Sequence, residues 1–214
     1  MKRGILHRMS SLFRGQSIAR ILMNEALAHE TLRGTVIDIG GGRSPNYFDF
    51  LQRADGVQIE TVDASLSGID FETDPLPFSD AYADTILLCN VLEHIYEHKF
   101  LLLQVHRVLK KEGHLIGFVP FWVGYHPDPH DFFRYTNEAL ERMLTEVGFK
   151  KVIIKRIGRG PILANFNTIV LSVPRIFRPL LFICYASSDW LFVHMRPQSV
   201  LRNPLGFLFV ASVE

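Results

Sequence analysis

The sequence VIDIGGGRSP at residues 36–45 decides the fold, because residues typical of a buried strand lead directly into three consecutive glycines. Only glycine lets a backbone turn sharply and still leaves space for a ligand to press against it. A second apolar run ends at Asp63, at about the 20-residue spacing at which an acid meets a ribose in nucleotide-binding βαβ units. This pattern predicts a site for a cofactor that contains adenosine.

The rest of the chain alternates between strand-like and helix-like segments. Apolar runs predict seven strands, at residues 35–39, 57–62, 69–71, 85–89, 115–119, 151–157 and 205–213. Helices are expected to begin near Asn46, to span residues 100–109 and to run from the cap Thr136 to Gly148. The alternation predicts an α/β fold with a doubly wound, mainly parallel sheet.

Two segments lie outside this alternation. Residues 1–34 predict an N-terminal helical extension that ends near Gly34, before a main domain at residues 35–214. Within that domain, residues 158–204 are too long for an ordinary connection and predict a hydrophobic insertion before the last strand. Its charge-free runs are shorter than the roughly 20 residues that a membrane-spanning helix needs. Three interpretations stay open: a lid over the site, a dimer interface, or a patch that contacts a membrane or lipid.

Composition excludes several classes of protein. Lys and Arg together number 23 and Asp and Glu 22, so no excess charge favours nucleic acid as a partner. Cys89 and Cys184 each lie in an apolar run, which indicates two reduced core thiols rather than a disulfide scaffold. Basic residues interrupt the apolar residues near the N-terminus, so we expect no signal peptide. We therefore predict a cytoplasmic protein. The hydrophobic insertion leaves peripheral contact with a membrane open.

Several ordered motifs between residues 35 and 119 resemble the class I S-adenosylmethionine-dependent methyltransferases, in particular the type 11 small-molecule group. VIDIGGG at residues 36–42 resembles the first motif of that family. LPFSD at 76–80 resembles its LPF segment, NVLEHI at 90–95 its LEH motif and RVLKKEG at 107–113 its RVLKPGG turn. The resemblance implies a Rossmann-like sheet with an antiparallel last strand, and methyl transfer from S-adenosylmethionine to a small-molecule or lipid-linked acceptor.

The resemblance also implies roles for individual residues. Backbone amides of the glycines would approach the methionine part of the cofactor, and Asp38 would meet its ammonium group. Asp63 would accept hydrogen bonds from both ribose hydroxyls. Glu72 or Asp74 would meet the adenine amino group. The implied cofactor-binding residues are Asp38, Gly40, Gly41, Gly42, Asp63, Glu72, Asp74 and Asn90. The alternatives are that Asp38 caps the amides of the turn and that Asp63 caps the next helix.

The candidate catalytic residues lie in the loop at residues 121–135, after a predicted strand and so at the carboxyl edge of the sheet. His126 or His130 would take a proton from the acceptor near neutral pH, and Asp128 or Asp131 would orient the ring. The alternative is that the polar residues of this loop only hold it in place. The spacing of the histidines and aspartates also suggests a metal, but no ligand elsewhere completes the set, so we predict none.

Two other functions remain open. The first is a non-catalytic cofactor-binding or scaffold protein that keeps a methyltransferase fold. The second is a nicotinamide-dependent oxidoreductase, which is disfavoured because Pro45 replaces the third glycine of the dinucleotide-binding motif.

Overall fold

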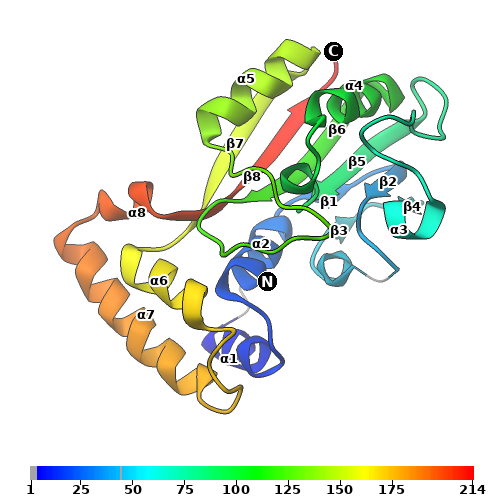
Figure 1. Cartoon of the computed structure of the whole chain (residues 1–214). Coiled ribbons are helices and arrows are strands. Elements are labelled where there is room, and N and C mark those ends of the chain that lie inside the picture. Colours follow the sequence, from blue (N-terminus) through cyan, green and yellow to red (C-terminus); the bar gives the residue numbers. More distant parts are fainter. Residues whose placement is uncertain (1–3, 44) are drawn as a thin grey trace.

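A computed structural model describes residues 4–43 and 45–214 (Figure 1). Six strands form its main sheet, in the order β4-β2-β5-β6-β8-β7. Strands β4, β2, β5 and β6 are parallel to one another, and β8 runs antiparallel to both of its neighbours. The strands are β2 (Thr35–Ile39), β4 (Gln58–Val62), β5 (Ala83–Cys89), β6 (Leu109–Pro120), β7 (Lys150–Gly158) and β8 (Pro204–Ser212). The prediction of a mainly parallel α/β sheet with an antiparallel last strand is confirmed.

The main sheet has one strand fewer than the seven predicted, because residues 69–71 form no strand. Hydrogen bonds within the segment take up its backbone groups instead: the Asp74 amide donates to the Asp70 carbonyl at 2.8 Å, and the Asp70 amide donates to the Asp74 carboxylate at 3.0 Å. Phe71 is buried and anchors this turn in the core. A separate two-stranded sheet pairs β1 (Thr31–Leu32) with β3 (Gln52–Arg53).

Helices cover both faces of the main sheet (Figure 1). Helices α4 (His98–Val108) and α5 (Asn137–Val147) pack against one face, and α2 (Ile18–Leu27) packs against the other. Helix α5 begins as predicted, because the Thr136 hydroxyl accepts a hydrogen bond from the Ala139 amide. It ends at Gly148, whose φ of +115° favours glycine.

Two predicted helices differ from the structure. The segment after the glycines forms only the short 3-10 helix η1 (Asn46–Asp49), because the chain then continues into β3. The N-terminal helix ends at Leu27 rather than near Gly34, because the residues that follow form β1. Both corrections have the same cause, since pairing between β1 and β3 takes up backbone that a longer helix would need.

A helical lobe, defined here as α1 (Ile5–Phe13), α6 (Pro161–Ile169), α7 (Arg178–Met195) and α8 (Ser199–Arg202), lies to one side of the sheet (Figure 1). Helices α6, α7 and α8 lie between β7 and β8 in the sequence, within the predicted insertion. Leu12, Phe166 and Phe182 form part of its core. The buried Asp189 carboxylate joins α7 to α6, because it accepts hydrogen bonds from three backbone amides at the start of α6, at 2.8, 2.9 and 3.1 Å. Within residues 4–43 and 45–214, no helix combines the length and the apolar character needed to span a bilayer.

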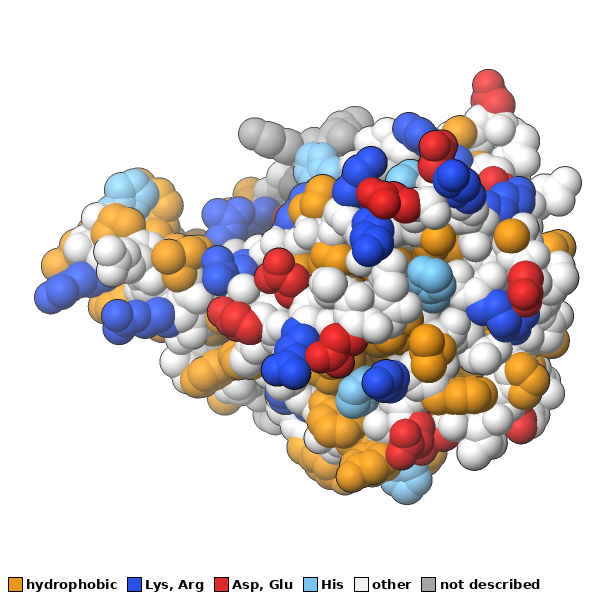
Figure 2. All heavy atoms as spheres, turned by 90° about the horizontal axis from the view of Figure 1, so that it is seen from above, with side chains coloured by type: hydrophobic (Ala, Val, Ile, Leu, Met, Phe, Trp, Pro, Cys, Tyr) orange, Lys and Arg blue, Asp and Glu red, His pale blue; other side chains and the backbone are white. Residues whose placement is uncertain are grey.

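The surface mixes charges of both signs, as expected from the nearly balanced composition (Figure 2). The part that projects at the left of this view, where Figure 1 places α7 and α8, carries hydrophobic and basic side chains. Cys184 on α7 is exposed, whereas Cys89 at the end of β5 is buried, and both are free thiols. The prediction that both cysteines lie in the core is therefore wrong for Cys184, because its apolar run forms an outward-facing part of α7.

Candidate active site

The glycine turn at the carboxyl end of β2 is fixed by close packing. Gly40 and Gly42 have φ values of +71° and +66°, which glycine adopts without strain. A Cβ atom on Gly41 would lie 1.8 Å from Oδ2 of Asp38, so no side chain fits there. The Gly40 amide donates to the Val62 carbonyl at 2.8 Å and so joins the turn to β4.

Asp38 is fully buried beneath this turn. Its Oδ1 accepts a hydrogen bond from the Tyr47 hydroxyl at 2.5 Å, whereas its Oδ2 has no hydrogen-bond partner among the described residues. Burial raises the pKa of Asp38 to about 6, although the bond from Tyr47 opposes this shift. A buried carboxylate oxygen without a donor favours a cationic ligand group, and the ammonium group of S-adenosylmethionine fits this requirement.

Asp63 lies at the end of β4, beside the same turn. Its Oδ2 accepts the Gly42 amide at 3.0 Å, and its Oδ1 accepts the Ser65 amide at 3.0 Å. Asp63 therefore caps the short helix α3 (Ala64–Ser67), which was one of the two predicted interpretations. Oδ1 also accepts the Ser65 hydroxyl at 2.5 Å, whereas Oδ2 can accept a further hydrogen bond, so the cap leaves the ribose-binding role open.

The remaining predicted cofactor-binding residues are Glu72, Asp74 and Asn90. Glu72 accepts the Tyr96 amide at 3.0 Å, and Asp74 is exposed in the turn described above. Asn90 has a left-handed backbone conformation with φ of +56°, and its backbone N–H donates to the Phe118 carbonyl at 2.8 Å. Asn90 lines the same cavity as Gly40 and Gly41, whereas Glu72 and Asp74 do not line it.

A cavity of about 650 Å³ opens at the carboxyl edge of the sheet. The glycine turn, the end of β5, the loop after β6 and helices α2 and α6 contribute its walls. The predicted site residues that line it are Gly40, Gly41, Asn90 and His126. Asn167 of α6 also lines the cavity. Its side chain connects α6 to α2 and to the loop after β6, because it accepts the Ala19 amide at 2.9 Å and donates to the Trp122 carbonyl at 3.3 Å. The helical insertion therefore helps to shape the cavity.

Arg134 and Asp131 hold the loop after β6 in place. The guanidinium donates to both oxygens of Asp131, at 2.5 and 2.8 Å, and keeps the pKa of this carboxyl well below its ordinary value. Asp131 also accepts the His126 amide at 2.9 Å and lies 3.5 Å from Nδ1 of that ring. The ring of His130 is exposed and packs on Phe132, outside the lining of the cavity. Of the two candidate histidines, the structure places only His126 at the cavity.

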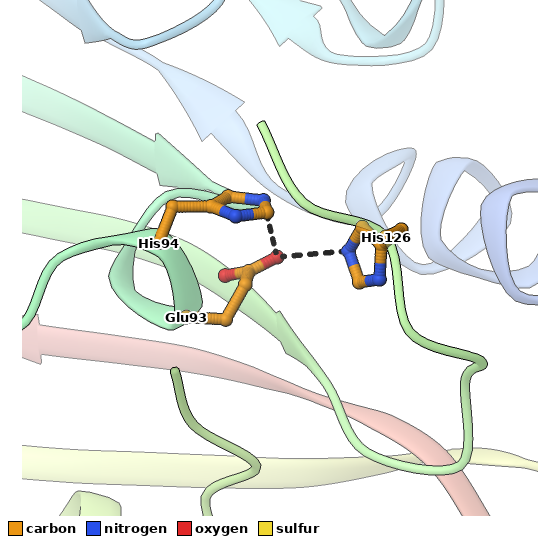
Figure 3. A group of neighbouring side chains, drawn as sticks. All are labelled: Glu93, His94 and His126. Atoms are coloured by element: carbon orange, nitrogen blue, oxygen red, sulfur yellow. Dashed lines mark ion pairs between the residues drawn. The ribbon is translucent and has the colours of Figure 1, made fainter. Parts of the chain in front are cut away.

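A buried carboxylate faces His126, and it was absent from the residues predicted from the sequence (Figure 3). Glu93 is 0% exposed, and its Oε1 lies 3.8 Å from Nε2 of His126 and 3.7 Å from Nε2 of His94. Neither oxygen has a hydrogen-bond partner among the described residues. The nearby Glu93 carboxylate raises the pKa of His126, with smaller contributions from the Gly124 carbonyl and Asp131, whereas burial opposes the shift.

The topology of the sheet explains this juxtaposition. Glu93 and His94 follow β5, and His126 follows β6, its parallel neighbour. The carboxyl ends of adjacent parallel strands meet at one edge, so the LEH motif and the histidine loop are brought together. This signal was present in the sequence, because Glu93 and His94 belong to the LEH motif.

Comparisons with known proteins agree with this fold. A family model described as a methyltransferase domain matches residues 7–153. Three solved structures superimpose along most of the chain. One is an S-adenosylmethionine-dependent methyltransferase from Archaeoglobus fulgidus, with 17% identity, 94% of this chain and 96% of that chain covered, and a TM-score of 0.54. The second is a possible histamine N-methyltransferase from Thermotoga maritima, with 12% identity, 98% of this chain and 95% of that chain covered, and a TM-score of 0.53. The third is 1,6-didemethyltoxoflavin-N1-methyltransferase from Burkholderia thailandensis with bound 1,6-didemethyltoxoflavin and S-adenosylhomocysteine, with 13% identity, 97% of this chain and 84% of that chain covered, and a TM-score of 0.52. No curated protein matches the sequence.

At these identities the solved structures show the fold alone. The family model spans well over half of the chain and includes the glycine turn, the LPF and LEH segments and the histidine loop. The chain therefore belongs to the class I S-adenosylmethionine-dependent methyltransferases, and S-adenosylmethionine is its cofactor.

Proposed function

We propose that this methyltransferase acts on an acceptor bound in the cavity between the glycine turn and the histidine loop. One observation carries the proposal: a single cavity is lined both by Gly40 and Gly41, beside the unpaired Asp38 oxygen, and by a wall that contains His94 and His126. A cofactor held at the glycine turn would present its methyl group toward that wall. The cavity therefore provides the alignment that an in-line displacement requires.

The cofactor roles follow from charge and position. Asp38 binds the ammonium group, the amides of the glycine turn approach the methionine part, and Asp63 accepts the ribose hydroxyls. Asn90 contributes to the wall beside the methionine part. For the adenine amino group, Glu72 is the stronger of the two proposed acids, because its bond to the Tyr96 amide holds it near the LEH segment, whereas Asp74 is committed to its own turn.

The reaction breaks the bond between the cofactor sulfur and the methyl carbon and forms one between that carbon and the acceptor. The electron pair of the broken bond stays on sulfur and gives S-adenosylhomocysteine. An oxygen or nitrogen acceptor must also lose a proton, and we propose His126 as the residue that faces this atom. Asp131 positions His126 through its backbone amide. His130 is the weaker candidate, because its ring lies outside the cavity lining.

The insertion favours an apolar or lipid-linked acceptor. Thr168 and Leu171 from this segment line the cavity, and several large apolar side chains of the same segment are exposed: Ile176, Phe177, Leu180, Trp190, Leu191 and Met195. An exposed apolar surface of this kind is typical of contact with a membrane or a protein partner. We propose that α7 lies against a lipid surface that presents the acceptor, with a homodimer as the alternative.

Calorimetric titration of the full chain with S-adenosylmethionine and S-adenosylhomocysteine tests the cofactor site, and we expect both to bind. Methyl transfer from labelled cofactor is then measured with a panel of phenolic, amine and lipid-linked acceptors. Binding without transfer to any acceptor would favour the non-catalytic alternative. Absence of binding would contradict the proposed site.

A further inference from the structure

Three hydrogen-bond acceptors converge on one point beside the cavity (Figure 3). They are Oε1 of Glu93 and the Nε2 atoms of His94 and His126, which lie 3.7 and 3.8 Å from that oxygen. One ligand atom from each of the three residues lies within 4.8 Å of the other two. The Glu93 side chain is 0% exposed, and no described residue donates a hydrogen bond to it. An isolated buried carboxylate costs several kcal/mol of desolvation, so such a group normally faces a cation.

The other ring nitrogens of both histidines are already committed. Nδ1 of His94 donates to the His130 carbonyl at 2.5 Å. Nδ1 of His126 lies 2.9 Å from the Gly124 carbonyl and 3.5 Å from the Asp131 carboxylate, and both of these groups are acceptors. We therefore assign the proton of the neutral His126 ring to Nδ1, although an Arg134 nitrogen also lies 3.3 Å away. In the neutral rings, both Nε2 lone pairs therefore face Glu93. Metal-binding histidines usually donate their second nitrogen to a carbonyl or carboxylate in this way.

We propose that Glu93, His94 and His126 bind a divalent transition-metal ion. Donors at about 2.1 Å from a tetrahedral ion lie about 3.4 Å apart, and the two Glu93 contacts of 3.7 and 3.8 Å exceed that spacing by only a few tenths of an ångström. Two imidazoles and one carboxylate suit Zn²⁺, Fe²⁺ or Co²⁺ better than Mg²⁺ or Ca²⁺, which prefer oxygen ligands. Zn²⁺ is the first ion to test.

Three protein ligands leave at least one coordination position, and both histidines line the cavity. If the proposed function holds, the class of acceptor follows, namely one with a hydroxyl group that binds the ion. Coordination weakens the O–H bond, and the proton passes to solvent before the oxygen attacks the methyl carbon. His126 would then act as a ligand rather than as a base.

Binding is tested by titrating the metal-free full chain with Zn²⁺ in a calorimeter and with Co²⁺ in a spectrophotometer. We expect one ion per chain, visible absorption bands typical of Co²⁺ with fewer than six ligands, and a higher Tm when Zn²⁺ is present. Glu93→Gln and His126→Asn should each weaken Zn²⁺ binding by more than about 10-fold. His130→Ala removes a ring of the same loop outside the ligand set and should bind Zn²⁺ as the wild type does.

The stability of Glu93→Gln without metal separates this site from an ordinary ion pair. A neutral amide can donate to an imidazole lone pair, so we expect the metal-free variant to melt no lower than the metal-free wild type. A lower Tm for Glu93→Gln, together with equal Zn²⁺ affinities of variant and wild type, would overturn the inference. Calorimetry with S-adenosylhomocysteine on the same samples tests the cofactor site separately, because Asp38 and the glycine turn supply none of the three ligands.

Discussion

Asp38 and Glu93 are both fully buried carboxylates, each behind residues that line the same cavity, yet their surroundings differ. Asp38 keeps one donor, the Tyr47 hydroxyl, and leaves one oxygen unpaired, whereas Glu93 has two imidazoles beside it and no donor. The first arrangement suits a single ammonium group, and the second suits an ion that several ligands share. If both proposals hold, one cavity serves two different cations.

The charge of Asp38 should control cofactor affinity. Its pKa in the folded protein, about 6, lies above the ordinary value of 3.8, so folded protein without cofactor holds more protons than unfolded protein between these values. Stability from this group is present below pH 3.8 and is lost as pH rises through about 6. Affinity for the cofactor ammonium changes in the opposite direction and should increase over the same range.

Calorimetry between pH 5 and 8 checks this prediction with wild type, Asp38→Asn and the exposed control Asp55→Asn. Asp38→Asn should weaken S-adenosylmethionine binding by about 10- to 100-fold at pH 7.5, as expected for loss of a charged hydrogen bond worth about 1.5–3 kcal/mol. It should also flatten the pH dependence. An unchanged pH profile in Asp38→Asn would show that another group is responsible.

Gly41→Ala should disrupt the same end of the cavity by steric means. The added Cβ would lie 1.8 Å from the Asp38 carboxylate and 2.6 Å from the Tyr47 hydroxyl, so the turn or the buried pair must move. We expect loss of measurable S-adenosylhomocysteine binding and a lower Tm. Gly4→Ala, where an added Cβ meets nothing within 4 Å, is the control. Binding that survives Gly41→Ala would mean that the turn is not the cofactor site.

At the level of elements, the Asp189 carboxylate should stabilise the helical lobe. Its three backbone hydrogen bonds satisfy amides at the N-terminus of α6, which the helix itself leaves without partners. Asp189→Asn keeps the shape but removes the charge and one acceptor. Chemical denaturation should show a loss of about 1–3 kcal/mol, and faster hydrogen exchange should be confined to α6 and α7. The same loss in Asp55→Asn would show a general charge effect instead.

Elements with a local cause were predictable from the sequence, and those set by distant pairing were not. Thr136 and Gly148 delimit α5 through contacts within a few residues, so their pattern was sufficient. The shortened helix after the glycines depends on pairing between β1 and β3, about which local periodicity carries no information. The candidate site shows the same division: the motifs indicated Asp38 and the glycine turn, whereas Glu93 meets His126 only through the order of the strands.

For the molecule as a whole, the outer face of α7 should determine association with lipid. A variant with Leu180→Asp, Leu191→Asp and Met195→Asp removes three exposed apolar side chains from this helix. A control with Leu66→Asp, Leu103→Asp and Ile153→Asp changes the same number of exposed apolar residues elsewhere. In flotation with anionic phospholipid vesicles, wild type and control should float and the α7 variant should not.

Light scattering on the same three proteins examines the alternative. A dimer in wild type and control that is lost in the α7 variant, without flotation of any of them, would assign this face to a second copy of the chain. Equal behaviour of all three proteins in both experiments would remove α7 as an interaction surface.

The position of β8 has a consequence for the order in which the chain folds during synthesis. Among the described residues, strand β7 pairs only with β8, which leaves the ribosome after it. The four parallel strands can assemble as soon as β6 has emerged, whereas β7 must wait for residues 204–212. A nascent chain that stops before Pro204 therefore carries an unpaired strand edge, which is a feature that exposes an intermediate to aggregation.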